Sequence, residues 1–228
     1  MSRSVEQWAA QLQQLDRSEW LAFLDSNSGL PGPRANTSLA TALAHLADPG
    51  MVDQLLASDD EYQMLCGAVC LGAQVVDPEV RAKLRVLAVD ERWRVREGVV
   101  IGIQEAADTD LPAVQSVVLD WAGDPEPLMA RAAAAAICEP RLLRSPEAAA
   151  IAIDVCRHAT AVLVALPGTA RRSAAARSLR QSLGYCWSVA VAADPTALAE
   201  FKALDNTDPD VEWIVRTNLK KKRLARLL

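Results

Sequence analysis

Five X-Pro steps, spread along the 228-residue chain, most constrain what it can fold into. They are Asp77-Pro78, Asp124-Pro125, Ser145-Pro146, Asp194-Pro195 and Asp208-Pro209. An Asp or Ser side chain can accept a hydrogen bond from a free backbone N–H at the start of a helix. Proline fits the next position because its missing N–H would have no partner there. Each step therefore predicts the start of a helix, and the stretch Ser58-Asp59-Asp60-Glu61 resembles a capping box.

The apolar residues that follow these starts have helical spacing. After Pro78, for example, Val80, Leu84 and Leu87 fall on one face of a helix. No strand-turn-strand pattern interrupts this spacing, so we predict an all-α protein of about a dozen helices. The Gly- and Pro-rich stretch 26–38 is expected to separate the N-terminal helices from the rest.

A seven-residue frame, D-x-x-W-x-V-R, occurs twice in the chain. Asp90, Trp93, Val95 and Arg96 match Asp210, Trp213, Val215 and Arg216. Weaker copies bring the frame ends to residues 65, 96, 131, 177 and 216, which lie 31 to 46 residues apart. Repeats of this length are typical of stacked helix pairs, because one pair alone cannot bury its apolar face.

The Asp followed five and six positions later by Val-Arg resembles the HEAT-repeat superfamily. The resemblance covers roughly residues 36 to 228 and implies a right-handed α-solenoid of about five or six helix pairs. It also implies that Asp90, Arg96, Asp210 and Arg216 form a ladder between neighbouring repeats. We expect a single domain over 1–228, in which 1–35 contains N-terminal helices and a turn and 36–228 contains the repeats.

A second resemblance, to bacterial HEAT-like alkylpurine DNA glycosylases, comes from Trp93 and Glu97, which are one helical turn apart. In that family a carboxylate follows a Trp by four positions on a concave surface. The resemblance implies that Trp93 and Trp187 contact the sugar and base, that Glu97 stabilises developing positive charge, and that Arg131 holds phosphate. The alternative is that Trp93 and Trp213 are repeat-packing residues and that the arginines belong to the ladder between repeats. Those arginines are Arg96, Arg131 and Arg216.

Two basic clusters offer further candidate contacts. The first contains Arg171, Arg172, Arg177 and Arg180, and the second contains Lys220, Lys221, Lys222, Arg223 and Arg226. The first cluster, with Arg177 as its representative binding residue, would suit an acidic partner or a nucleic-acid backbone. The alternative is a solvated face or a repeat ladder. The second cluster complements the negative end of a helix, or contacts nucleic acid.

Composition limits the remaining classes. A net charge of −5 and a sequence pI of about 5.1 argue against broad attraction to nucleic acid or to an acidic membrane. The five cysteines form no four-ligand zinc pattern and are expected to be buried thiols. We therefore expect no metal and no cofactor. We find no apolar run of the roughly 18 to 20 residues that a membrane span needs, and we expect a cytoplasmic monomer.

These observations favour a binding or scaffold protein that presents a concave surface to a protein or to DNA. The alternative is a HEAT-like DNA glycosylase, or a damaged-DNA-binding protein that recognises alkylated bases.

Overall fold

The computed structural model describes residues 4–227, and all regular structure in this part of the chain is helical. The prediction of an all-α protein is confirmed. The contacts group the chain into two compact units, Met1–Thr109 and Asp110–Leu228. We call them unit 1 and unit 2 and describe each by itself.

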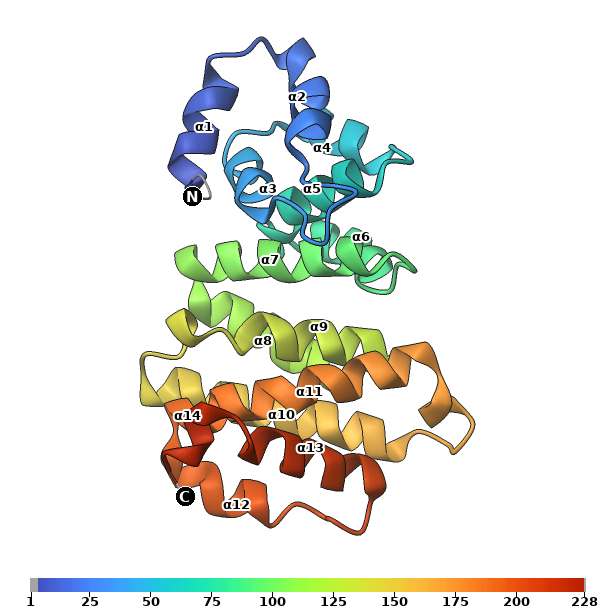
Figure 1. Ribbon diagram of the computed structural model, residues 1–228, viewed down its shortest axis with the longest axis vertical. Helices are drawn as coiled ribbons and strands as arrows, with labels where there is room; N and C mark the ends of the chain where they lie inside the picture. The colour runs from blue at the N-terminus through green and yellow to red at the C-terminus, as the bar shows by residue number, and fades with distance from the viewer. Residues whose placement is uncertain (1–3, 228) are drawn as a thin grey trace. The chain divides into compact units, whose positions relative to one another are not determined.

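Unit 1 contains seven α-helices and one short 3-10 helix in its described part. They are α1 (Val5–Gln13), η1 (Arg17–Glu19), α2 (Trp20–Asn27), α3 (Thr37–Ala44), α4 (Pro49–Leu56), α5 (Glu61–Gly72), α6 (Pro78–Ala88) and α7 (Trp93–Thr109). The odd-numbered helices contact one another in succession, α1 with α3, α3 with α5 and α5 with α7. Helices α4 and α6 pack against this row (Figure 1).

Glycines let α5 and α7 approach until their backbones touch. A Cβ atom on Gly102 would lie 2.3 Å from the carbonyl oxygen of Val69 and 2.6 Å from the Cα of Gly72. A Cβ on Gly98 would lie 2.6 Å from the carbonyl oxygen of Leu65. Because these obstacles are backbone atoms, no rotation of a side chain can relieve the clash. The contact between α5 and α7 therefore depends on the glycines.

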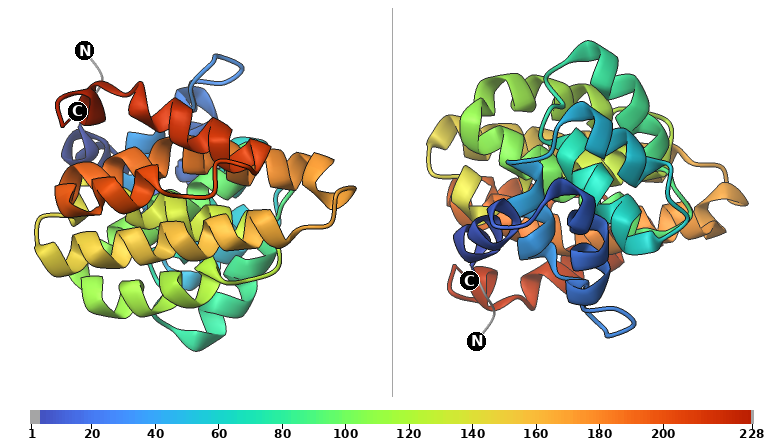
Figure 2. Two further views of the ribbon diagram at one scale, coloured as in Figure 1. Left: turned by 90° about the horizontal axis from the view of Figure 1, so that it is seen from below. Right: turned by 90° about the horizontal axis from the view of Figure 1, so that it is seen from above.

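Unit 2 contains seven α-helices and three short 3-10 helices in its described part. They are α8 (Leu111–Ala122), α9 (Pro127–Ile137), η2 (Pro140–Leu142), α10 (Pro146–Ala165), η3 (Ala170–Arg172), α11 (Ala174–Ala193), η4 (Pro195–Ala197), α12 (Leu198–Lys202), α13 (Pro209–Leu219) and α14 (Lys222–Ala225). Helix α11 contacts both α9 and α13, and α10 contacts α8. Figure 2 shows α13, in red, beside α11 in orange.

A buried amide joins α11 to α13. Asn218 is completely buried. Its Oδ1 accepts a hydrogen bond from the backbone N–H of Ser188 at 2.8 Å, and its Nδ2 donates to the carbonyl of Leu183 at 2.9 Å. A buried polar group that lost these bonds would be costly, so Asn218 holds α13 in one register on α11.

Most of the predicted helix starts are confirmed. Asp77, Ser145 and Asp208 are the N-caps of α6, α10 and α13, and a Pro follows each. The step at Asp194 begins the 3-10 helix η4 instead, and α12 comes after it. The start predicted at Pro125 is wrong by two residues, because Pro127 takes the first helical position and Glu126 caps α9. The segment from Ser58 forms a simple cap by Asp60 rather than a capping box.

Helix α10 corrects one expectation. By length and composition it qualifies as a membrane-spanning candidate, although no apolar run of that length was expected. Half of its most apolar 18-residue window is buried inside the structure. The run was missed because Asp154 and Arg157 divide it in the sequence.

We expect Gly102→Ala to destabilise unit 1 by about 1 to 3 kcal/mol, because the new methyl group would push α7 away from α5. Gly50→Ala, in α4, is the matched control. Its Cβ would meet only the Asp48 side chain, at 3.4 Å, so alanine there should be neutral or slightly stabilising. Urea unfolding of the two variants measures the difference. Equal stability would contradict the glycine contact.

Candidate functional site

Unit 2 carries a pocket of about 410 Å³ that is rich in arginine. Its walls come from the end of α10, from η3, from the first two turns of α11 and from the first turn of α13. The lining residues are Leu163, Arg171, Arg172, Ala176, Arg177, Arg180, Pro209 and Asp210. The structure thus brings together all four arginines of the first basic cluster in one site, which we call the arginine pocket.

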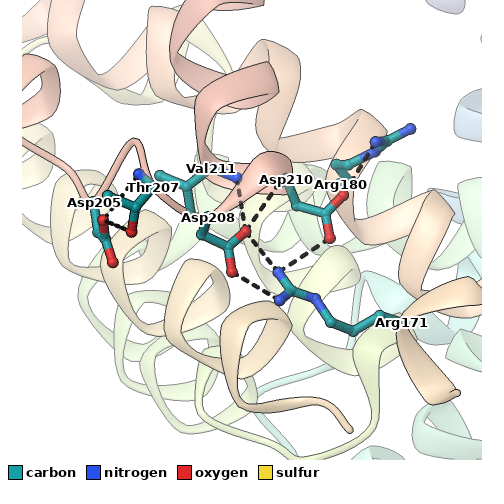
Figure 3. Close-up of polar contacts among 7 residues, drawn as sticks. All are labelled: Arg171, Arg180, Asp205, Thr207, Asp208, Asp210 and Val211. Carbon is teal, nitrogen blue, oxygen red and sulfur yellow. Dashed lines mark hydrogen bonds and ion pairs between the residues drawn. The ribbon is translucent and has the colours of Figure 1, made fainter. Parts of the chain in front are cut away.

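Arg171 is held by two carboxylates from the start of α13. Its Nη1 and Nη2 atoms donate to the two carboxylate oxygens of Asp208 at 2.7 and 2.8 Å, and Nη2 lies 3.0 Å from Oδ2 of Asp210 (Figure 3). The side chain of Arg171 is 20% exposed and that of Asp208 is 13% exposed. This shielding from solvent strengthens the pair relative to a surface ion pair.

Asp208 has a second role at the same place. Its Oδ1 accepts hydrogen bonds from the backbone N–H groups of Asp210 and Val211, at 2.9 and 3.2 Å, and so caps α13. The Arg171 guanidinium holds the pKa of Asp208 below its ordinary value. The same carboxylate therefore starts α13 and joins it to η3.

Arg180 forms the neighbouring wall from α11. Its Nη1 donates to Oδ1 of Asp210 at 3.1 Å. The guanidinium carbon also lies 4.6 Å from the centre of the Trp213 ring, a cation–π contact. Trp213 in turn covers Gly184, where a Cβ would come within 2.7 Å of the indole ring. Arg180 is therefore fixed by a carboxylate and an aromatic ring.

Arg172 and Arg177 differ from their two neighbours. Both are exposed, and within residues 4–227 neither forms an ion pair with a carboxylate. Nη1 of Arg177 donates to the backbone carbonyl of Arg172 at 2.5 Å. The arginine pocket therefore has two guanidinium groups neutralised by aspartates and two that are not.

The remaining expected site residues lie in separate surroundings. Trp93 and Glu97 are one turn apart on α7 in unit 1, where Trp93 is 52% exposed and Glu97 is half-buried. Arg131 is half-buried on α9 in unit 2 and is not part of the pocket lining. Trp187 is completely buried, donates a hydrogen bond to Thr160 at 3.0 Å and packs on Phe201. A buried ring is closed to a nucleotide, which corrects the ligand-binding role expected for Trp187.

The exposure of Trp93 has a simple cause. The two copies of the repeated frame sit at different points of their helices, because Trp93 is the first residue of α7 whereas Trp213 is the fifth residue of α13. Trp93 stacks on the adjacent Arg94, whose guanidinium carbon is 4.6 Å from the ring centre. About half of the surface of Trp93 faces solvent, so the ring is open to a ligand, and its role stays a prediction.

Of the expected ladder, Asp210 makes a contact between helices, whereas the role expected for Arg216 is wrong. Nη1 of Arg96 donates to the backbone carbonyl of Glu91 at 3.0 Å, and its place in a ladder stays a prediction. Asp210 does pair across helices, but with Arg171 and Arg180. Arg216 makes only an exposed pair with Glu212, at 3.6 Å along the same helix. In unit 1, Asp90 pairs locally with Arg92, and the contact between helices is made by Arg94 and Glu61 at 2.9 Å.

A second pocket, of about 480 Å³, lies in unit 1 beside the Arg94–Glu61 pair. Its other carboxylates are Asp25 and Asp60. Asp25 accepts a hydrogen bond from Gln63 at 2.8 Å, and Asp60 caps α5 through the N–H groups of Tyr62 and Gln63. Because each of these charges already has a partner, this pocket offers less to a ligand than the arginine pocket.

The five cysteines are free and buried, as expected. Burial raises the pKa values of the Cys66 and Cys156 thiols, and raises that of Cys70 to about 12. Thiols in this state are poor nucleophiles at neutral pH. Among the described residues, no group of three or more His, Cys, Asp or Glu side chains is placed to hold a metal ion.

Comparisons with protein families, with curated proteins and with solved structures find no match to this chain.

We expect Arg171→Gln to destabilise unit 2 by about 1 to 3 kcal/mol at pH 7, because it leaves Asp208 without its charged partner. Arg216→Gln, which removes an exposed pair, should cost less than about 0.5 kcal/mol. The lowered pKa of Asp208 means that its contribution to stability is present above its ordinary value of 3.8 and is lost as the pH falls through the lower folded value. Urea unfolding measures the free energy of unfolding of the two variants. The difference between these two free energies should therefore become smaller as the pH falls below 3.8.

Trp213→Ala should destabilise the protein by about 2 kcal/mol, since the ring packs on Gly184 and makes a cation–π contact with Arg180. Trp93→Ala should change stability by less than about 1 kcal/mol because half of that ring is already in solvent. Thermal unfolding followed by circular dichroism compares the two. A larger effect at Trp93 would contradict the burial of these two residues.

Proposed function

We propose that this chain is a non-enzymatic binding protein, built as an α-solenoid of HEAT-like helix pairs. Support comes from the helix contacts within each unit, where odd-numbered helices touch in succession. The frame ends also support it, because residues 65, 96, 131, 177 and 216 lie in α5, α7, α9, α11 and α13. One even-numbered helix intervenes each time, as repeated helix pairs require. The right-handed turn, the concave face, the cytoplasmic location and the monomeric state stay predictions.

We further propose that unit 2 binds an anionic part of a macromolecular partner at the arginine pocket. The observation that carries this proposal is a contrast among the described residues. Arg172 and Arg177 form no ion pair with a carboxylate there, whereas Arg171 and Arg180 do. Arginine is the residue best suited to bind carboxylate or phosphate groups of a partner, since its planar guanidinium can donate two parallel hydrogen bonds. A protein partner fits better than DNA because the chain carries a net charge of −5.

The test is binding of a fluorescent acidic peptide, followed by anisotropy between about 50 and about 300 mM salt. We expect binding that weakens as salt rises and that is lost in the double variant Arg172→Glu with Arg177→Glu. Arg144→Glu is the matched control because Arg144 is an exposed arginine of unit 2 outside the pocket. If the double variant and the control bind equally well, the proposal fails.

A DNA glycosylase remains the second candidate, and the exposure of Trp93 beside Glu97 favours it. A duplex that contains one alkylated purine, incubated with the protein and assayed for released base, separates the two candidates. The binding proposal expects no release. Release that disappears in Glu97→Gln, while the melting temperature stays the same, would establish the second candidate instead.

A further inference from the structure

We infer that the arginine pocket is a site for a phosphate monoester, carried on a phosphorylated side chain of the partner protein. This inference deepens the proposed binding function and rests on it. It names the chemical group that the pocket recognises, and it follows from the charge, the hydrogen-bond donors and the size of the pocket.

The charge of the pocket matches a dianion. Four arginines line it. Within residues 4–227 the carboxylates that form ion pairs with them are Asp208 and Asp210, which leaves two positive charges in excess. A phosphate monoester carries a charge of about −1.5 to −2 at pH 7. A carboxylate or a sulfate monoester would neutralise only one of the two excess charges. A phosphorylated side chain therefore fits the charge balance better than Asp or Glu does.

The donors that face a ligand are partly fixed in advance. Arg177 uses one N–H for the carbonyl of Arg172, which anchors its guanidinium and leaves the other N–H groups for a ligand. Arg171 and Arg180 are anchored by Asp208 and Asp210 and form a rigid wall. A preorganised site loses less conformational entropy when a ligand binds, so these contacts favour tight recognition of a compact anion.

The N-terminus of α11 adds to the positive electrostatic potential of the arginine pocket. The 20-residue helix begins directly after Arg172, with Ser173 as its N-cap. The Ser173 hydroxyl accepts the N–H of Ala176 at 3.1 Å, while the first N–H groups of a helix have no partner within it. The positive end of the helix dipole stabilises negative charge at this position. The helix start supports the arginines, which remain the main feature of the site.

The shape and the remaining residues favour a single phosphate on an organic carrier. Leu163, Ala176 and Pro209 bring apolar atoms into the lining beside the arginines, and a free inorganic ion could not use them. Asp208, Asp210 and Glu212 at the start of α13 would repel the next phosphate of a nucleic-acid strand. The pocket of about 410 Å³ has room for one phosphorylated residue with part of its neighbours.

The experiment is isothermal titration of the full chain with three monoester probes, and with an unphosphorylated acidic peptide and a single-stranded DNA for comparison. Phenyl phosphate tests the dianion, phenyl sulfate is a monoanion of nearly the same shape, and a phosphoserine peptide tests the protein carrier. We expect phenyl phosphate to bind one to one and at least about fivefold more tightly than phenyl sulfate, and the peptide to bind more tightly than either. Arg172→Gln and Arg177→Gln should each weaken the phosphate probes by about tenfold, and Arg144→Gln should not.

Each other outcome overturns the inference in a distinct way. Equal affinity for phosphate and sulfate, or no loss in Arg172→Gln and Arg177→Gln, excludes a dianion site in the pocket. If the phosphoserine peptide binds no more tightly than phenyl phosphate, the ligand is a small-molecule monoester. If single-stranded DNA binds more tightly than the phosphoserine peptide, the ligand is a nucleic acid. If an unphosphorylated acidic peptide binds through Arg172 and Arg177, the proposed function stands and the phosphate assignment falls. If no macromolecular probe binds, the proposed function falls as well.

Discussion

The bidentate contact between Arg171 and Asp208 holds the candidate site of unit 2 together. Asp208 caps α13 and neutralises Arg171 at the same time, so the position of α13 and the arrangement of the arginines depend on one carboxylate. Asp210, two residues further on, extends the contact to Arg180 on α11. Because these aspartates neutralise two of the four arginines, the pocket can hold its guanidinium groups close together without a ligand. Their mutual repulsion would otherwise open the site.

The fold was predictable as far as local chemistry determines it. The N-caps and prolines of α6, α10 and α13 were correct because a cap involves only neighbouring residues. The ends of the repeated frame lie in α5, α7, α9, α11 and α13, and the repeat itself stays a prediction. The start of α9 was misplaced where two prolines compete for the first helical position. The close contact of α5 with α7 was not foreseen, because isolated glycines carry no signal about which backbone they will meet.

The site was predictable only in part. The arginine cluster was visible, and Arg177 was among the expected binding residues, but the partners of Arg171 lie 37 and 39 residues later in the chain. No local pattern predicts such a pair. The frame suggested Arg96 and Arg216 as ladder residues, yet Arg216 faces solvent and the junction uses Arg171 and Arg180. Trp93 and Trp213 occupy the same position of the frame but differ in exposure, because the frame is shifted by four residues relative to the helix start.

A basic pocket in an acidic chain is not a contradiction. Charges on a protein surface act over about 8 to 10 Å at physiological salt, so the net charge of −5 is not what a small ligand senses inside the pocket. Within that distance the two guanidinium groups in excess determine the electrostatic potential that the ligand experiences. The net charge matters for a larger partner, because it repels a long polyanion that must also follow the rest of the surface. A local positive excess on an acidic protein therefore selects for a compact dianion over an extended one, and this selection needs no contact outside the pocket.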